Sequence, residues 1–190
     1  MVVVAAIGVV LYLVGAILML WRWLAPNGPL ESVDAIGVHS GPDFENWLRA
    51  QKAFEVWKRI ASEWIKPGIY CMGRATLELR SYLESLLIED RQSTAFVRGT
   101  GRSNNTFDNL SVLRDSLAML PFVRDIALVS SGYHRFRVER TGKRAGLSVT
   151  FQKAPSRSVF HILLEPIAII ADLLPIRRHV YDVVRSVRTK

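Results

Sequence analysis

The sequence has little of what several common protein classes require. It contains one cysteine, Cys71, which excludes an intramolecular disulfide. Its four histidines are too scattered to form a structural zinc site with that cysteine. It also lacks the G-x-S-x-G, P-loop, G-x-G-x-x-G and H-E-x-x-H motifs and any aspartate-rich cluster for magnesium. These absences leave no signature of a metal site, and no metal ligand is predicted.

Charged residues are also absent from the start of the chain. Residues 2–21 carry no charged side chain and no Asn, Gln or Pro. A helix of that length measures about 30 Å, which matches the hydrocarbon core of a bilayer. A cleaved signal peptide is the alternative, but no basic region precedes the apolar run and no small-x-small site precedes Trp21-Arg22-Trp23. We therefore predict a transmembrane anchor, residues 1–23, that contacts the lipid bilayer through residues 2–21.

A helix-breaking segment, Pro26-Asn27-Gly28-Pro29, follows the anchor and predicts a linker over residues 24–32. Arg22 is the one charged side chain that flanks the apolar run closely, and by the positive-inside rule it favours a cytoplasmic soluble domain. Because this rests on one residue, the side of the membrane stays open.

The rest of the chain is basic and rich in apolar residues. The 25 Lys and Arg against 17 Asp and Glu give a net charge of +8, all of it after Trp21. With 49% hydrophobic residues, the chain has too much apolar surface to stay disordered. The cations are dispersed and no recognition motif accompanies them, so we expect no nucleic acid partner.

After the linker, short apolar runs alternate with segments of helical periodicity. Strands are expected at residues 33–38, 69–72, 94–97, 126–130 and 147–152, and helices at 44–65, 76–87, 106–120 and 133–145. Strands separated by single helices form right-handed βαβ units. The predicted fold class is therefore α/β, with a Rossmann-like, mainly parallel sheet flanked by helices over residues 33–175, preceded by one transmembrane helix.

Two helical segments allow a more specific expectation. In the first helix, large apolar residues recur at steps of three and four and are expected to form core: Phe44, Trp47, Leu48, Phe54, Trp57, Ala61, Trp64 and Ile65. The apolar segment 159–176 contains His161, Glu165 and Asp172, which favour a buried helix on the sheet over a second membrane span. Residues 176–190 form a basic amphipathic tail, either a solvated helix end or a helix on an anionic membrane surface.

Polar residues gather where the predicted strands end. In a parallel sheet, ligands bind beyond the carboxyl ends of the strands. His134 and Arg137 follow the strand 126–130 on one helix face and are the predicted catalytic pair. The predicted ligand-binding residues at these ends are Ser40, Gly41, Gly73, Ser103, Asn105, Thr106, Ser130 and Ser131. Helix capping is the competing explanation for Ser103, Asn105 and Thr106. Arg49 is expected to be solvated, and Cys71 to be a core residue.

Two blocks resemble a known family. Residues 103–109, SNNTFDN, resemble the S-x-N-T-x-E-N block of the YdcF/SanA/ElyC proteins, and residues 128–137, LVSSGYHRFR, resemble their V-T-S-x-Y-H-x-x-R block. Arg49, Glu78 and Glu165 are further matches, and the resemblance covers about residues 33–175. It adds Glu78 and Asn109 to the predicted ligand-binding residues. Thr100 stands where the family has an acidic residue, which weakens an acid-base or metal role more than ligand binding.

The resemblance implies a Rossmann-like domain behind a membrane helix, in a single-pass protein of the bacterial inner membrane linked to cell-envelope integrity. Some relatives are reported to bind S-adenosylmethionine, so the cofactor of this chain is left unassigned. The resulting hypothesis is a membrane-anchored domain that binds a small anionic or nucleotide-like ligand in cell-envelope biogenesis; whether it catalyses a reaction is left open. The alternative is a non-enzymatic scaffold that recruits a protein partner through the α/β domain or the basic tail.

Overall fold

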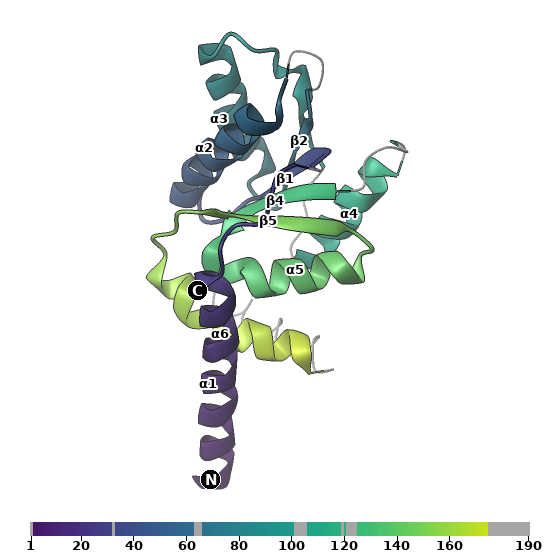
Figure 1. The fold of residues 1–190 in the computed structure, drawn as a ribbon. Coiled ribbons are helices and arrows are strands. Elements are labelled where there is room, and N and C mark those ends of the chain that lie inside the picture. The colour runs from purple at the N-terminus through teal and green to yellow at the C-terminus, as the bar shows by residue number, and fades with distance from the viewer. Residues whose placement is uncertain are drawn as a thin grey trace.

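A parallel sheet of five strands, in the order β3-β2-β1-β4-β5, forms the centre of the computed structural model (Figure 1). The structure describes residues 2–31, 33–62, 66–100, 106–118, 120 and 125–174. The strands are β1 Ala35–His39, β2 Gly68–Met72, β3 Val97–Gly99, β4 Asp125–Ser131 and β5 Ser148–Ala154. The α-helices are α1 Val2–Leu24, α2 Asp43–Ile60, α3 Thr76–Glu89, α4 Thr106–Leu117, α5 Arg135–Arg144 and α6 Val159–Leu173, and the short 3₁₀ helices are η1 Thr94–Phe96 and η2 Gly132–His134. The predicted α/β fold with a parallel sheet is confirmed.

Helices cover both faces of the sheet because successive strand residues point to opposite sides. One core cluster joins α2 and α3 to strand residues such as Ile36 and Val38. The other joins α4 and α5 to the alternate strand residues, such as Ala35 and Tyr70. Cys71 is fully buried in the first cluster, as expected for a core residue.

The helices α1 and α6 form an extra layer beyond α5 (Figure 1). Met19, Tyr133 and Ile169 form a third buried cluster there. Helix α6 was expected to pack on the sheet, but it packs against α1 and α5 instead. The reason is that α5 already covers that side of the sheet, so α6 buries its inner face on α5 and η2.

The predicted linker segment lies along the edge strand β5. Gly28 N donates to Phe151 O at 3.2 Å, and Gln152 Nε2 donates to Gly28 O at 2.8 Å. Arg135 Nη1 donates to the carbonyls of Ala25 and Pro26 at 2.8 and 2.7 Å. These bonds satisfy part of the edge of β5 and hold the end of α1 against the domain.

Several predicted boundaries differ from the structure. Residues 94–96 form η1, whose N-cap Ser93 accepts from Ala95 N, and the strand follows at Val97–Gly99. Helix α2 ends at Ile60 because Ala61 is extended, and Trp64 and Ile65 lie outside the described residues. Phe44 and Trp47 are 58% and 37% exposed, so their place in the predicted core stripe was wrong. Residues 176–190, the predicted tail, also lie outside the described residues.

Candidate functional site

The strand order reverses between β1 and β4. From β1 the chain continues to β2 and β3 on one side of the sheet, and then crosses to β4 and β5 on the other. At such a switch point the loops after the two strands separate and leave a crevice at their carboxyl ends. His39 ends β1 and Ser131 ends β4, so the loops that carry the predicted residues meet here.

A buried ion pair lies at this point. Arg49 of α2 is fully buried, and its Nη2 lies 2.9 Å from Glu45 Oε2, one turn earlier in the same helix. The guanidinium also donates to His39 O at 2.8 Å and to Ser131 Oγ at 2.7 Å, which connects both strand ends. A Cβ at Gly41 would overlap this guanidinium, so glycine is needed beside it. The expectation that Arg49 is solvated was wrong.

Glu45 accepts hydrogen bonds from two distant segments of the chain. Its Oε2 accepts from Ser131 Oγ at 2.8 Å and from Tyr133 OH at 3.2 Å. Its Oε1 accepts from the loop between β5 and α6: the Ser156 hydroxyl, and the backbone N–H groups of residues 157 and 158, each at 3.2 Å. Burial alone would raise its pKa, but the Ser156 hydrogen bond and the Arg49 charge keep it below the usual value.

A second buried pair flanks the first. Arg137 Nε donates to Glu165 Oε1 at 2.6 Å, which joins α5 to α6. His134 Nδ1 lies 2.9 Å from Glu165 Oε2 and 3.2 Å from Arg137 Nη2. Burial would raise the pKa of Glu165, but the charge of Arg137 holds it below its usual value. Burial lowers the pKa of His134 despite the nearby Glu165, so this imidazole is neutral at pH 7.

His39 lies near both pairs, since its carbonyl accepts from Arg49 and its imidazole interacts with His134 and Arg137. Its Nε2 is 3.3 Å from Asn109 Nδ2, a contact that joins the C-terminal end of β1 to the first turn of α4. Burial is the largest cause that lowers its pKa to about 3, and the neighbouring groups His134, Arg49 and Arg137 lower it further. Together Glu45, Arg49, His39, Ser131, His134, Arg137 and Glu165 form what we call the switch-point cluster.

The other predicted residues divide into four groups. Ser40, Gly73 and Asn109 lie together, since a Cβ at Gly73 would meet Ser40 Oγ and Asn109 Nδ2. Gly41 N donates to Asn46 Oδ1 at 2.8 Å, and Asn46 Nδ2 donates to Glu78 Oε2 at 3.1 Å, so Glu78 positions a loop after β1. Ser130 is buried in β4, and its hydroxyl has no hydrogen-bond partner among the described residues. Thr106 begins α4, and Ser103 and Asn105 lie outside the described residues.

Sequence reasoning missed His39 and Glu45 as members of the switch-point cluster, and Tyr133 as a donor to Glu45. The i,i+4 spacing of Glu45 and Arg49 indicated an ion pair on one face of the helix. That pair lies in the same stripe as the buried Ala50, Ala53 and Trp57. A polar pair within an apolar stripe was the available signal for a buried ion pair.

Gly73 has a φ of +103°, a backbone conformation that favours glycine. We expect Gly73→Ala to lower the free energy of unfolding by about 1–3 kcal/mol through strain, with a further loss because the new methyl would overlap Ser40 Oγ. Gly146→Ala is the matched control, because Gly146 has a φ of +76° but open space around it. Urea denaturation of both variants measures the difference; equal losses would show that the Ser40 contact costs nothing.

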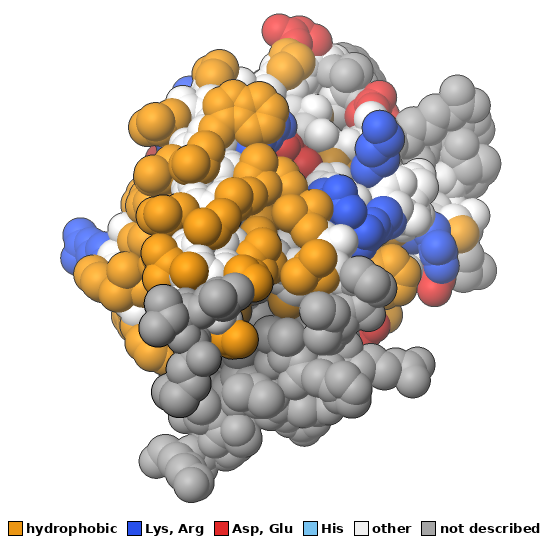
Figure 2. Space-filling model, turned by 90° about the horizontal axis from the view of Figure 1, so that it is seen from below, with side chains coloured by type: hydrophobic (Ala, Val, Ile, Leu, Met, Phe, Trp, Pro, Cys, Tyr) orange, Lys and Arg blue, Asp and Glu red, His pale blue; other side chains and the backbone are white. Residues whose placement is uncertain are grey.

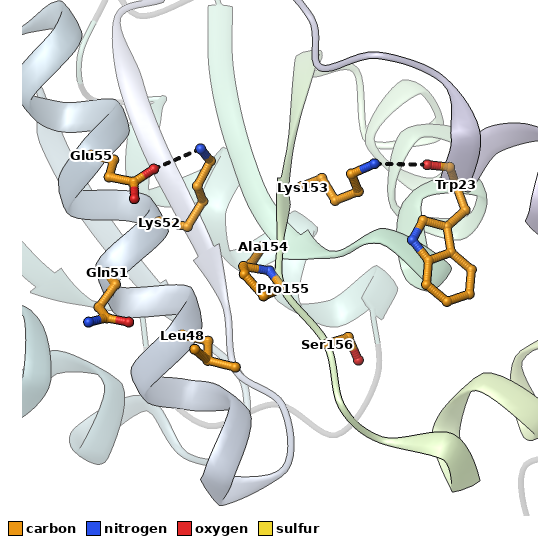
Figure 3. Close-up of a pocket in the computed structure, with 9 residues that line it drawn as sticks. All are labelled: Trp23, Leu48, Gln51, Lys52, Glu55, Lys153, Ala154, Pro155 and Ser156. Atoms are coloured by element: carbon orange, nitrogen blue, oxygen red, sulfur yellow. Dashed lines mark hydrogen bonds and ion pairs between the residues drawn. The ribbon is translucent and has the colours of Figure 1, made fainter.

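A cavity of about 450 Å³ lies beside the carboxyl end of β5 (Figure 3). It is lined by Trp23, Leu48, Gln51, Lys52, Glu55, Lys153, Ala154, Pro155 and Ser156. Its two lysines have partners, since Lys52 Nζ lies 2.8 Å from Glu55 Oε2 and Lys153 Nζ lies 3.3 Å from Trp23 O. No predicted site residue lines this cavity; Ser156 connects it to the switch-point cluster through the hydrogen bond to Glu45.

Within the described residues no group of three or more His, Cys, Asp or Glu side chains is placed to hold a metal ion. Comparison with known proteins adds no further information: no family model, no curated protein and no solved structure matches the chain. A functional assignment therefore depends on the geometry of the switch-point cluster and on the sequence blocks.

Proposed function

We propose that the chain is a membrane-anchored α/β protein of the YdcF/SanA/ElyC type whose switch-point crevice binds a small anionic or nucleotide-like ligand, in bacterial cell-envelope biogenesis. One observation carries the proposal: Arg49, Arg137, His39 and His134 converge where β1 and β4 end. Their proximity is reflected in the pKa of His39, which burial lowers most and the other three groups lower further. Two guanidinium groups and two imidazoles at a switch point provide several N–H donors, which favours an anionic ligand.

The two pairs suggest different roles in binding. Arg49 makes hydrogen bonds to three partners and is fully enclosed, so it positions the loops after β1 and β4. His134 has the most exposed side chain of the cluster, at 19%, and the side chain of Arg137, beside it, is 9% exposed. A neutral His134 is able to accept a proton or to donate a hydrogen bond to an anion. We therefore assign ligand contact to His134 and Arg137, with Glu165 orienting both.

The anchor is the second part of the proposal. The described residues contain one helix long and apolar enough to cross a membrane, and it is mostly exposed, a property that a signal sequence shares. The end of this helix, however, is packed into the fold. The rings of Trp23 and Tyr133 pack edge to face with their centroids 6.4 Å apart, and Arg22 pairs with Glu139 of α5. Cleavage before the domain would remove these contacts and expose Tyr133, which supports an uncleaved anchor.

The ligand proposal is tested by thermal unfolding of the full chain in detergent. Wild type, His134→Gln and Arg137→Lys are compared in the presence of nucleotides, S-adenosylmethionine and lipid-linked phosphate precursors. A ligand at about a hundred times its dissociation constant adds roughly 2.7 kcal/mol, a shift of a few degrees. Arg114→Ala is the matched control, because Arg114 lies on the exposed surface of α4 and pairs with Asp115.

Stabilisation of wild type and the control, but neither site variant, supports the crevice as the binding site. Equal stabilisation of all four proteins would place the ligand elsewhere. No shift with any probe would favour the scaffold alternative, for which one observation also speaks: Arg49 and Arg137 are each already paired with a buried carboxylate. Capture of a protein partner by the α/β domain would then be the next measurement.

A further inference from the structure

Helix α6 presents an apolar face to its surroundings. Four large apolar side chains of this helix are exposed: Val159 by 67%, Phe160 by 54%, Leu163 by 55% and Ile167 by 41%. Their spacing of one, four and eight residues from Val159 places them within about 100° of the helix circumference. Figure 2 shows the molecule from below, where apolar side chains form a broad surface with Lys and Arg along part of its edge.

The opposite face of α6 is polar and points into the domain. Glu165 and Asp172 are 3% and 4% exposed, and Ile169 between them is fully buried. Glu165 is held there by Arg137 and His134. The charged groups of α6 are therefore turned away from the apolar face, which is the arrangement of a helix that lies in a membrane interface.

The contacts between α6 and α1 set the depth of α6 along the proposed anchor. Tyr12 OH donates to Leu163 O at 3.2 Å, and a Cβ at Gly15 would overlap the Pro166 carbonyl. Both contacts are near the middle of α1. The part of α1 before Tyr12 is residues 2–11, a length of only about 15 Å, or half of a hydrocarbon core of about 30 Å. If α1 spans the bilayer, α6 must lie below the membrane surface.

The exposed surface of α1 agrees with this depth. Beyond the α6 contact, Ile17, Trp21 and Leu24 are 65%, 64% and 80% exposed, so apolar surface continues to the end of the helix. The ring of Trp21 lies under Arg22, with the guanidinium 5.2 Å from the ring centroid, an arrangement suited to the headgroup region. The apolar face of α6 is thus continuous with the proposed membrane-spanning surface of α1.

We propose that α6 is an in-plane membrane helix, whose face Val159, Phe160, Leu163 and Ile167 inserts among the lipid acyl chains beside α1. The occupant of this face is the bilayer, and the proposal depends on the proposed anchor. The exposed Lys143 and Arg144 at the end of α5, which packs on α6, would then lie near the headgroups and favour anionic lipids. The sheet would be held close to the membrane, with the Glu165 side of the switch-point cluster at its surface.

The test measures the lipid exposure of single positions in the full chain. Phe160→Cys and Leu163→Cys are labelled with an environment-sensitive fluorophore and reconstituted into vesicles of phosphatidylcholine and phosphatidylglycerol with brominated acyl chains. Leu77→Cys on α3, where Leu77 is 69% exposed, is the matched control, and Val9→Cys reports on the anchor. The native Cys71 is fully buried with its pKa raised to about 12 by that burial, so it does not react at pH 7.

We expect brominated lipid to quench the labels at positions 160, 163 and 9 several-fold more strongly than the label at position 77. Quenching at 9 but not at 160 and 163 would overturn the inference and leave the anchor intact. No quenching at any position would overturn both the proposed in-plane helix and the proposed anchor. Disulfide cross-links between copies at position 163, without lipid quenching, would assign this face to a second copy of the chain and also overturn the inference.

Discussion

Replacing Glu45 by alanine is expected to lower the free energy of unfolding by about 3–5 kcal/mol, because it leaves the fully buried Arg49 without its counter-charge. The variant also removes the acceptor of several hydrogen bonds, which increases the loss of stability. The donors left without this acceptor are Ser131 Oγ, Tyr133 OH and the backbone N–H groups of residues 157 and 158. The loop that enters α6 is held by the same carboxylate, so we expect it to open in this variant.

Urea denaturation of the full chain in detergent measures the effect. Glu55→Ala is the control on the same helix, because Glu55 pairs with Lys52 but is 58% exposed, and a surface pair contributes about 0–1 kcal/mol. The double variant Glu45→Leu with Arg49→Met removes both charges and should recover part of the stability that the single variant loses. Equal losses for Glu45→Ala and Glu55→Ala would show that the buried pair does not hold the site together.

The fold was accessible from the sequence because its signals are local. Buried strands such as β4 read as continuous apolar runs, and turn residues separate each strand from the next helix. The boundaries of β1, β2, β4 and β5 were predicted to within two residues at each end. The weakest prediction was β3, a strand of three residues at the sheet edge that follows a 3₁₀ turn. So short a strand carries too few residues to show a period.

The site was predicted only in part, because its charges are paired across distant segments. The sequence places Arg49 on an amphipathic helix, where solvation is the usual outcome. Its burial depends on Ser131, 82 positions later, and on the loop that follows β5 and reaches Glu45. Such pairings appear only when the sheet brings the strand ends together. The positions named by the sequence blocks, His134 and Arg137, do lie there, but against Glu165 rather than open to a ligand on all sides.

The packing partner of α6 is a second feature that could not be predicted from the sequence. The residues Glu165 and Asp172 indicated a buried helix, and both are buried as expected. They do not reveal which surface the helix covers. That choice depends on α5, which occupies the sheet, and on Gly15, whose lack of a side chain lets α1 approach α6 closely. From the sequence, a helix with two buried acids was compatible with packing on the sheet and with packing on other helices. Only the tertiary structure distinguishes these two arrangements.

Acid is expected to destabilise the protein strongly through His39. The folded state holds the pKa of His39 at about 3, whereas the unfolded chain has the ordinary value of 6.5, so only the unfolded state binds this proton between those values. The contribution of His39 to the free energy of unfolding is therefore fully present above pH 6.5 and is lost as the pH falls toward 3. At pH 4 this one group accounts for a loss of about 3 kcal/mol relative to pH 7. Glu45, Glu165 and His134, whose pKa values are also lowered, act in the same direction.

Two measurements separate His39 from those neighbours. The NMR titration of its imidazole should show a neutral ring down to about pH 4, and a midpoint near the ordinary value would contradict the buried position of His39 beside Asn109. The variant His39→Gln removes the titrating group but keeps an amide that can bond to Asn109. Between pH 6 and pH 4 its unfolding free energy should fall less steeply than that of wild type, by up to about 1.4 kcal/mol per pH unit. An unchanged slope would assign the acid sensitivity to Glu45, Glu165 and His134, and not to the imidazole of His39.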